Sequence, residues 1–316
     1  MPSDAPLPLA GDLEFGFITG FGHREAARDT AALARRCAFD CVWVGDHVAF
    51  PVPILDPLLQ LAQLAAFDDT IGLGTSVYLL PLRHPVLVAK QVASLDHLSG
   101  GRFRFGVGIG GEFAGEYAAC GVPLRERGAR LEAAIPLVRR LLRGEPTASE
   151  APCFPFPETT LAPAARDPQG PPIWAGGRAE PALERMGRLA DGWISYVVTP
   201  ERYRKGLDTI AAAAERSGRK PERFGTAHLL FVRIDDDAER ALDDATAHLS
   251  NRYAMDFRDA ARRYAALGRP ADVAERIGAF RAAGVRHVIL DCVGPMQDRN
   301  DQLQRFAEEV RPLLGA

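Results

Sequence analysis

Two patterns of hydrophobic and polar positions alternate along this chain. Short runs of β-branched, aromatic and aliphatic residues, typical of buried strands, are each followed by an amphipathic segment rich in Ala and Arg. The short runs predict strands at residues 13–19, 41–44, 71–80, 103–107, 173–175, 192–196, 225–234 and 288–290. The amphipathic segments predict helices at residues 24–38, 58–67, 86–98, 129–142, 181–189, 201–217, 237–250, 271–283 and 301–314.

Eight strands that alternate with helices predict an α/β protein with a parallel sheet and right-handed crossovers. The eightfold count favours closure into a (β/α)₈ TIM barrel over an open doubly wound sheet. Residues 144–172 interrupt the rhythm after the fourth helix, and they are rich in Pro, with Phe154 and Phe156 between prolines. We expect a single domain over residues 1–316, with residues 144–172 as an insertion that lies across the barrel.

Composition narrows the class of protein without changing this picture. The 316 residues are 47% hydrophobic and 25% charged, with a net charge of −3, which is ordinary for one soluble barrel. The slight negative charge argues against nucleic-acid or anionic-membrane partners. No signal-peptide pattern and no apolar run of about 18 residues is present, and the five cysteines lack metal spacing, so we expect a cytoplasmic protein with reduced thiols and no metal.

Candidate chemistry gathers where the strands end. In a closed parallel barrel the active site lies at the carboxyl ends of the strands, which meet at one rim. The polar and glycine residues there are Asp46 and His47 after the second strand, Ser76 and Val77 in the third, Gly110, Gly111 and Glu112 after the fourth, Gly176, Gly177 and Arg178 after the fifth, and Tyr196 after the sixth. We expect them to form one ligand site.

Each of these motifs has two interpretations. Gly176, Gly177 and Arg178 before a helix suit a phosphate group, but glycines also suit a simple βα turn. Asp46-His47 could carry acid–base chemistry, or Asp46 could be a capping residue and His47 a structural one. Residues 106–111 resemble a dinucleotide fingerprint, yet they stand on the fourth strand instead of the first, and no strand with a ribose-binding acid follows about 20 residues later.

Longer stretches resemble the luciferase-like monooxygenase family. The most characteristic are HPVLVAKQVASLDHLSGGR at residues 84–102 and GVGIGG at residues 106–111. Others are VWVGDH at 42–47, CGVPLRERGARLEA at 120–133, PPIWAGG at 171–177, DGWI at 191–194 and GRPADVAERIGAFRAAGVRHVIL at 268–290. The resemblance covers nearly the whole chain after residue 13.

The resemblance implies a cofactor, either flavin mononucleotide (FMN) or the deazaflavin coenzyme F420, in the barrel mouth. A non-prolyl cis peptide at Ser76-Val77 would lie behind the ring, and the phosphate would lie near Gly176, Gly177 and Arg178. Asp46-His47 resembles the F420-dependent branch, where the Asp contacts the ring and the His lies near the reacting carbon. Many FMN-dependent members carry Glu-His or Glu-Ser there instead.

In that branch His47 or Glu112 would move the proton that accompanies hydride transfer. Asp46, Ser76, Val77, Gly110, Gly111, Gly176, Gly177, Arg178 and Tyr196 would contact the cofactor. The substrate, a small organic molecule, would lie under Phe50, Pro51, Tyr78, Phe113 and the insertion. The resemblance also implies a homodimer, often packed through the second and third helices.

Three other functions remain open. An FMN-dependent monooxygenase would keep the same fold and would take reduced flavin from NAD(P)H or from a partner reductase. A barrel that binds a flavin without turnover would be a carrier or storage protein. A doubly wound nicotinamide dehydrogenase would need residues 106–111 to bind pyrophosphate.

Overall fold

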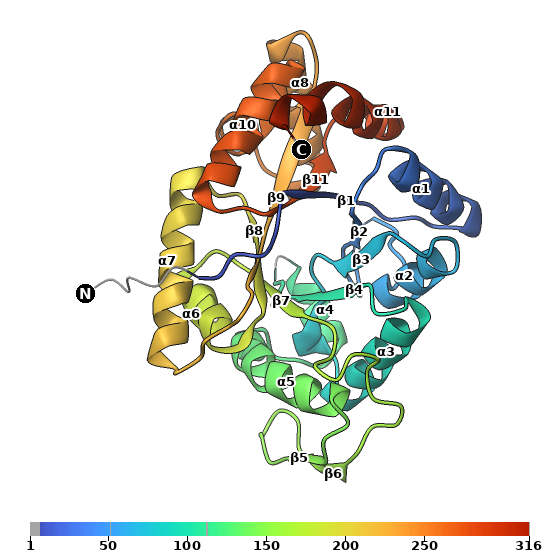
Figure 1. Cartoon of the computed structure of the whole chain (residues 1–316), viewed down its shortest axis with the longest axis vertical. Coiled ribbons are helices and arrows are strands. Elements are labelled where there is room, and N and C mark those ends of the chain that lie inside the picture. The colour runs from blue at the N-terminus through green and yellow to red at the C-terminus, as the bar shows by residue number, and fades with distance from the viewer. Residues whose placement is uncertain (1–6, 51, 112, 316) are drawn as a thin grey trace.

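Parallel strands form a closed barrel at the centre of the molecule (Figure 1). The computed structural model describes residues 7–50, 52–111 and 113–315. Its barrel strands are β1 (Glu14–Ile18), β2 (Cys41–Val44), β3 (Gly72–Thr75), β4 (Phe103–Val107), β7 (Ile173–Gly176), β8 (Gly192–Tyr196), β9 (Gly225–Ile234) and β11 (His287–Cys292). They pair in chain order, β11 lies between β9 and β1, and pairing of β8 with β9 completes the ring. The predicted α/β TIM barrel is therefore confirmed.

Helices surround the barrel, with at least one after each barrel strand, as Figure 1 shows. The main ones are α1 (Arg24–Arg36), α2 (Pro57–Ala65), α3 (Pro85–Leu98), α5 (Arg127–Leu142), α6 (Glu180–Leu189), α7 (Pro200–Arg216), α8 (Ala238–Tyr253) and α10 (Pro270–Ala283). Local chemistry explains their ends. At α2, the Asp56 carboxylate accepts hydrogen bonds from the amides of Leu58 and Leu59, and Pro57 takes the first helical position.

Several short elements were not predicted. Helix α4 (Ala114–Ala119) lies between β4 and α5, and strand β10 (Ala266–Gly268) lies between α8 and α10, whereas helix α9 (Arg258–Tyr264) lies where the sequence indicates a second helical stretch after residue 250. Such short elements hold too few turns to show a hydrophobic period. The predicted helix at 301–314 begins as α11 (Arg299–Arg305) and continues as a π turn and a 3₁₀ turn to Leu314.

The predicted insertion takes a different place from the one expected. Its strands β5 (Thr147–Ser149) and β6 (Phe156–Thr159) form a small antiparallel pair at the edge of the molecule (Figure 1). The Lys90 ammonium of α3 donates to the Ala162 carbonyl, and the Arg130 guanidinium of α5 lies 4.4 Å from the Phe154 ring centroid. The segment thus packs outside α3 and α5, and the expectation that it lies across the barrel was wrong, because its aromatic rings found partners on those helices.

A polar layer occupies the amino end of the barrel. The Trp43 indole N–H donates to His287 Nε2 at 2.9 Å, and His287 Nδ1 lies 2.9 Å from a Glu14 carboxylate oxygen. Burial would raise the pKa of Glu14, but His287 and Arg104 hold it at about 2. The polar groups of Trp43, His287 and Glu14 are therefore paired with one another, and they lie at the opposite end of the barrel from the predicted site.

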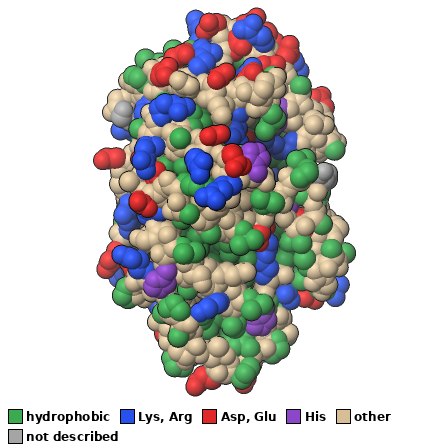
Figure 2. Space-filling view, turned by 90° about the vertical axis from the view of Figure 1, so that its right-hand side faces the viewer, with side chains coloured by type: hydrophobic (Ala, Val, Ile, Leu, Met, Phe, Trp, Pro, Cys, Tyr) green, Lys and Arg blue, Asp and Glu red, His purple; other side chains and the backbone are tan. Residues whose placement is uncertain are grey.

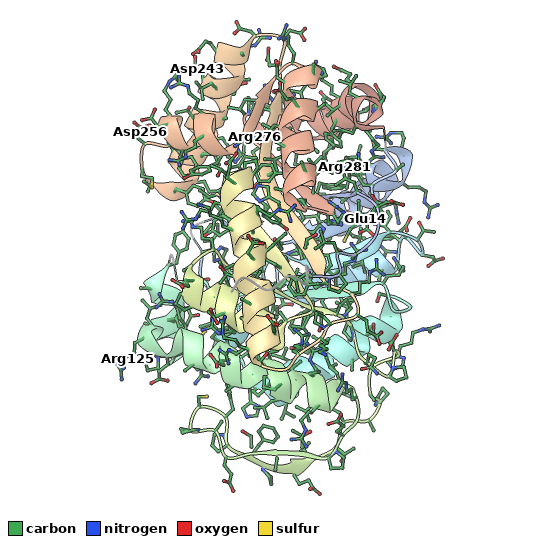
Figure 3. All side chains as sticks on the ribbon, turned by 60° about the vertical axis from the view of Figure 1, so that its left-hand side comes forward. Glu14, Arg125, Asp243, Asp256, Arg276 and Arg281 are labelled. Atoms are coloured by element: carbon green, nitrogen blue, oxygen red, sulfur yellow. The ribbon has the colours of Figure 1, made fainter. Side chains whose placement is uncertain are left out.

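The outer surface mixes charges of both signs. On the face in Figure 2, Lys and Arg side chains are interspersed with Asp and Glu. Figure 3 shows such groups on the outer helices, with Asp243 on α8 and Arg281 on α10. Among the described helices, none is long and apolar enough to cross a membrane.

Candidate active site

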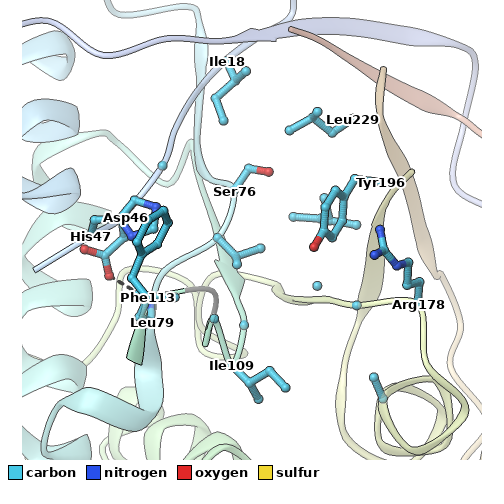
Figure 4. Close-up of a pocket in the computed structure, with 18 of the residues that line it drawn as sticks. Ile18, Asp46, His47, Ser76, Leu79, Ile109, Phe113, Arg178, Tyr196 and Leu229 are labelled. Atoms are coloured by element: carbon cyan, nitrogen blue, oxygen red, sulfur yellow. Dashed lines mark hydrogen bonds between the residues drawn. The ribbon is translucent and has the colours of Figure 1, made fainter. Parts of the chain in front are cut away.

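A cavity of about 400 Å³ opens at the carboxyl ends of the strands (Figure 4). It brings together residues that follow β2, β3, β4, β7 and β8. The predicted site residues that line it are Asp46, His47, Ser76, Val77, Gly110, Gly176, Gly177, Arg178 and Tyr196. Gly111 does not line it and lies beside Arg127 instead, while Glu112 falls outside the described residues.

Close packing around Val77 shapes one wall of the cavity. The Ser76–Val77 peptide bond is cis, as the family resemblance implied. A Cβ on Gly176 would lie 2.8 Å from a Val77 methyl group, and one on Gly108 would overlap the same side chain. A Cβ on Gly106 would overlap the Thr75 carbonyl. The glycines at 106 and 108 therefore allow β4 to approach β3 closely, which explains them without a dinucleotide.

His47 is held firmly at the edge of the cavity. Its Nδ1 lies 3.0 Å and 3.2 Å from the two carboxylate oxygens of Glu116. The Phe50 ring stacks on the imidazole with centroids 3.9 Å apart, and the Phe113 ring meets it edge-on at 5.5 Å. The His47 side chain keeps 23% of its surface exposed, so it is fixed and still accessible.

The Asp46 carboxylate accepts its hydrogen bonds from other groups of the protein. One oxygen accepts from the Leu79 amide at 2.8 Å, and both oxygens accept from the Arg83 guanidinium at 2.5 and 2.9 Å. The Asp46 carboxylate is buried, the Arg83 side chain is partly exposed, and its guanidinium also lies over the Tyr78 ring. The structure therefore gives Asp46 a clear role in holding the end of β2 against the segment that follows β3.

An anion-binding geometry lies on the far side of the cavity. Gly177, Arg178 and Ala179 precede α6, whose N-terminus has no side-chain cap. The Arg178 guanidinium lies 4.8 Å from the Tyr196 ring centroid, and no described carboxylate forms an ion pair with it. The Gly177 amide donates to the Ile194 carbonyl at 3.4 Å, so the uncapped N–H groups at the start of α6 and the Arg178 cation are the groups that suit a phosphate.

A second cation, Arg185 of α6, lies on the same side of the cavity as Arg178. Arg185 lines the cavity with only 11% of its side chain exposed, and its Nε lies 3.5 Å from a Glu132 oxygen. Arg185 was not predicted, because it follows the glycine turn by a full helical turn and looks like an ordinary surface position in the sequence.

The third wall was also missed. Arg252 of α8 and Asp291 of β11 line the cavity as an ion pair with an N–O distance of 2.5 Å. His248 accepts from Arg252 at 2.8 Å and lies 2.7 Å from the Gly294 carbonyl. Burial lowers the pKa of Arg252, but the Asp291 carboxylate raises it above its usual value. Asp291 directly follows the predicted eighth strand at residues 288–290 and is the penultimate residue of β11, so the rule that placed the site at the strand ends points to Asp291 as well.

The predicted aromatic cover is only partly present. Phe50 and Phe113 line the cavity, whereas Pro51 falls outside the described residues. Tyr78 is 1% exposed beneath Arg83 and does not line it, and neither do Phe154 and Phe156. Those three expectations were wrong because the Tyr78 and Phe154 rings are buried by other neighbours, and the half-buried Phe156 ring packs against His84.

Comparison with known proteins agrees with this architecture. Residues 14–309 match the model of the family described as luciferase-like monooxygenase. The phthiodiolone/phenolphthiodiolone dimycocerosates ketoreductase of Mycobacterium tuberculosis is 29% identical over 273 residues, which cover 76% of this chain and 71% of that protein.

Solved structures share the fold at lower identity. An F420-dependent secondary alcohol dehydrogenase in complex with an F420-acetone adduct has a TM-score of 0.84 and 18% identity, over 96% of this chain and 99% of that one. The monooxygenase RslO1 from Streptomyces bottropensis has a TM-score of 0.81 and 23% identity, over 95% of this chain and 99% of that one.

Proposed function

This chain belongs to the luciferase-like monooxygenase family, and from that premise we propose that it is an oxidoreductase that uses F420 for hydride transfer. The observation that carries the proposal is His47, which a carboxylate and two aromatic rings hold at the edge of the cavity. A fixed, accessible imidazole beside a ring-sized cavity supports chemistry in which a proton accompanies a hydride.

The residues of the cavity fit a flat ring system that carries a phosphate. A volume of about 400 Å³ lies within the range of about 300–1,000 Å³ for such sites. Apolar side chains supply the walls for a ring, namely those of Ile18, Val77, Ile109, Ile194 and Leu229. At the other end, the Arg178 amide, the start of α6 and the Arg178 guanidinium would hold a phosphate.

Bound F420 would supply the carbon that gives or accepts a hydride, and the protein would supply orientation and the proton. His47 would exchange that proton with the substrate oxygen. Phe50 and Phe113 cover His47 and would exclude water from the transfer. Arg252 and Asp291 neutralise each other, so the opposite wall would present a fixed dipole instead of a net charge.

A carbonyl compound or an alcohol is the substrate class that we propose. Hydride addition to a carbonyl carbon leaves an oxygen that needs one proton, and the reverse reaction releases one. The relative named as a ketoreductase supports this class, as do the apolar walls of the cavity. The substrate would be a small uncharged organic molecule.

FMN-dependent monooxygenation is the second candidate. The observation that favours it is the anion-binding turn at Gly177 and Arg178, because the phosphate of FMN would fit it as well. Such an enzyme would need reduced flavin from NAD(P)H or from a partner reductase.

Parallel titration of the purified protein with F420 and with FMN, followed by absorbance and fluorescence, separates the two candidates. We expect clear preference for F420, followed by cofactor reduction with an alcohol or by cofactor oxidation with a ketone. Clear preference for FMN would overturn the F420 assignment, and binding of neither would reject the proposed function.

Two substitutions assign roles within the cavity. Arg178→Ala should weaken cofactor binding by about tenfold or more, because one charge-assisted hydrogen bond is worth about 1.5–3 kcal/mol. Arg125→Ala is the matched control, since Figure 3 shows Arg125 at the outer edge of the molecule.

His47→Ala should lower turnover by about 100-fold and leave cofactor affinity nearly unchanged. Unchanged turnover would remove His47 from the mechanism.

A further inference from the structure

Glu116 is a buried carboxylate beside the site, and the sequence analysis did not select it. It lies on α4 with 1% of its side chain exposed. One oxygen, Oε1, accepts from the backbone amides of Val48 at 2.7 Å and Ala49 at 3.1 Å. The other, Oε2, lies 3.0 Å from His47 Nδ1. Glu116 therefore joins the helix after β4 to the loop after β2.

These contacts determine which nitrogen of His47 carries a proton. Two backbone N–H groups donate to the same carboxylate oxygen, which is the environment of an ionised, acceptor-only carboxylate. A neutral imidazole has one donor and one acceptor nitrogen, so Nδ1 must be the donor toward Glu116. The acceptor is then Nε2, which has no hydrogen-bond partner within the described part of the chain.

We propose that Glu116 is a positioning residue that holds His47 as the Nδ1–H tautomer and so leaves Nε2 free to accept a proton from the substrate. The catalytic part of this inference rests on the proposed function, whereas the tautomer rests on the contacts alone. Glu116 itself is too buried to reach a substrate, and all its contacts lie within the protein.

The substitution Glu116→Gln tests the tautomer directly. Gln has one acceptor atom and one NH₂ donor. The amides of Val48 and Ala49 both need an acceptor, so they will take the Gln oxygen, and the NH₂ group will face His47 Nδ1. Nδ1 must then accept, and the proton must move to Nε2. The variant thus reverses donor and acceptor on His47 with little change in shape.

Long-range ¹H–¹⁵N correlation spectra of the histidine rings report the tautomer. A His47→Gln variant identifies the His47 signals among those of the seven histidines. We expect the Nδ1–H form in the natural chain and the Nε2–H form in Glu116→Gln, near pH 8 where imidazole is largely neutral. Glu116→Asp keeps a carboxylate and should keep the Nδ1–H form, which gives a second variant if Glu116→Gln does not fold.

Turnover provides the second readout. In the direction that needs a base, Glu116→Gln should lower kcat by about 100-fold or more, within the range of general-base effects, with KM changed by less than about twofold. In the His47→Ala background the same substitution should have no further effect on kcat. Glu150→Gln, an exposed position in the insertion, is the matched control.

The outcomes separate this inference from the proposed function. An Nε2–H tautomer in the natural chain, or an unchanged tautomer in Glu116→Gln, would overturn the inference whichever cofactor binds. A reversed tautomer with unchanged kcat would overturn the catalytic part. Failure to bind F420 or FMN would reject the proposed function and leave the tautomer result standing.

Discussion

Replacement of His228 by Phe is expected to make the folded protein less sensitive to acid. His228 lies on β9 with 1% exposure, its ring stacks on Phe280 at 4.0 Å, and its Nδ1 lies 2.7 Å from Ser195 Oγ. Its Nε2 has no hydrogen-bond partner among the described residues. The charged ring would need two acceptors in this dry environment, so burial lowers the pKa of His228 to about 3.

The sign and size of the effect follow from this lowered pKa. In the unfolded chain the imidazole binds a proton near its ordinary value of 6.5, whereas the folded chain resists protonation down to about 3. Between these values the unfolded state holds more protons, so the free energy of unfolding falls as the pH falls. The unfolded imidazole is half protonated at pH 6.5, and each further pH unit removes up to about 1.4 kcal/mol, so a fall from about pH 6.5 to about pH 4.5 removes about 2.3 kcal/mol.

Urea unfolding at these two pH values measures the effect in the natural chain and in His228→Phe. Phe has a larger ring, and its packing cost of about 1–3 kcal/mol is the same at both pH values and cancels. Acid-sensitive carboxylates such as Glu14 are present in both proteins and cancel as well. The natural chain should lose about 2.3 kcal/mol more than the variant over this interval.

An exposed histidine provides the control. His23 caps α1 by accepting from the Ala26 amide, and Asn keeps that cap, so His23→Asn should behave like the natural chain at both pH values. If the free energy of unfolding falls equally in the natural chain and in His228→Phe, the reasoning is refuted. Equal losses would mean that His228 binds a proton equally well in the folded and unfolded states.

Three further predictions test other parts of the structure. Gly278→Ala should raise the free energy of unfolding by about 0.5–1 kcal/mol, because a Cβ inside α10 meets open space, and a lower Tm would contradict it. Arg83→Met should lower the free energy of unfolding, measured with urea, by about 3–5 kcal/mol, because the Asp46 carboxylate would stay buried without a cation. A loss below about 1 kcal/mol would show that other groups compensate the charge of Asp46. We also propose the homodimer that the family resemblance implies, packed through α2 and α3. Leu59→Lys, at a side chain 72% exposed on α2, should convert this dimer into monomers in light scattering, while Leu313→Lys at the C-terminal end should not. An unchanged mass for Leu59→Lys would reject this face as the interface.

Residue patterns alone predicted most of the barrel and its rim. The strand runs and amphipathic segments repeat at fixed periods, and parallel strands with right-handed crossovers leave few ways to close. Closure then places every strand end at one rim, which is why Asp46, His47 and Arg178 were found by position alone. The cis Ser76–Val77 bond followed from the family resemblance, whereas the packing of glycines against Val77 was not predicted.

Only the tertiary structure decided how the rim residues pair. Glu116 meets His47 across 69 residues of chain, and Asp291 meets Arg252 across 39. The insertion could have covered the mouth, but Phe154 packs beneath Arg130 on the outer side of α5. Periodicity records which face of an element is buried, and it holds no information on which loops meet. That choice depends on loop lengths and on side-chain packing between distant segments, and here it determines the partner, and hence the proton, of His47.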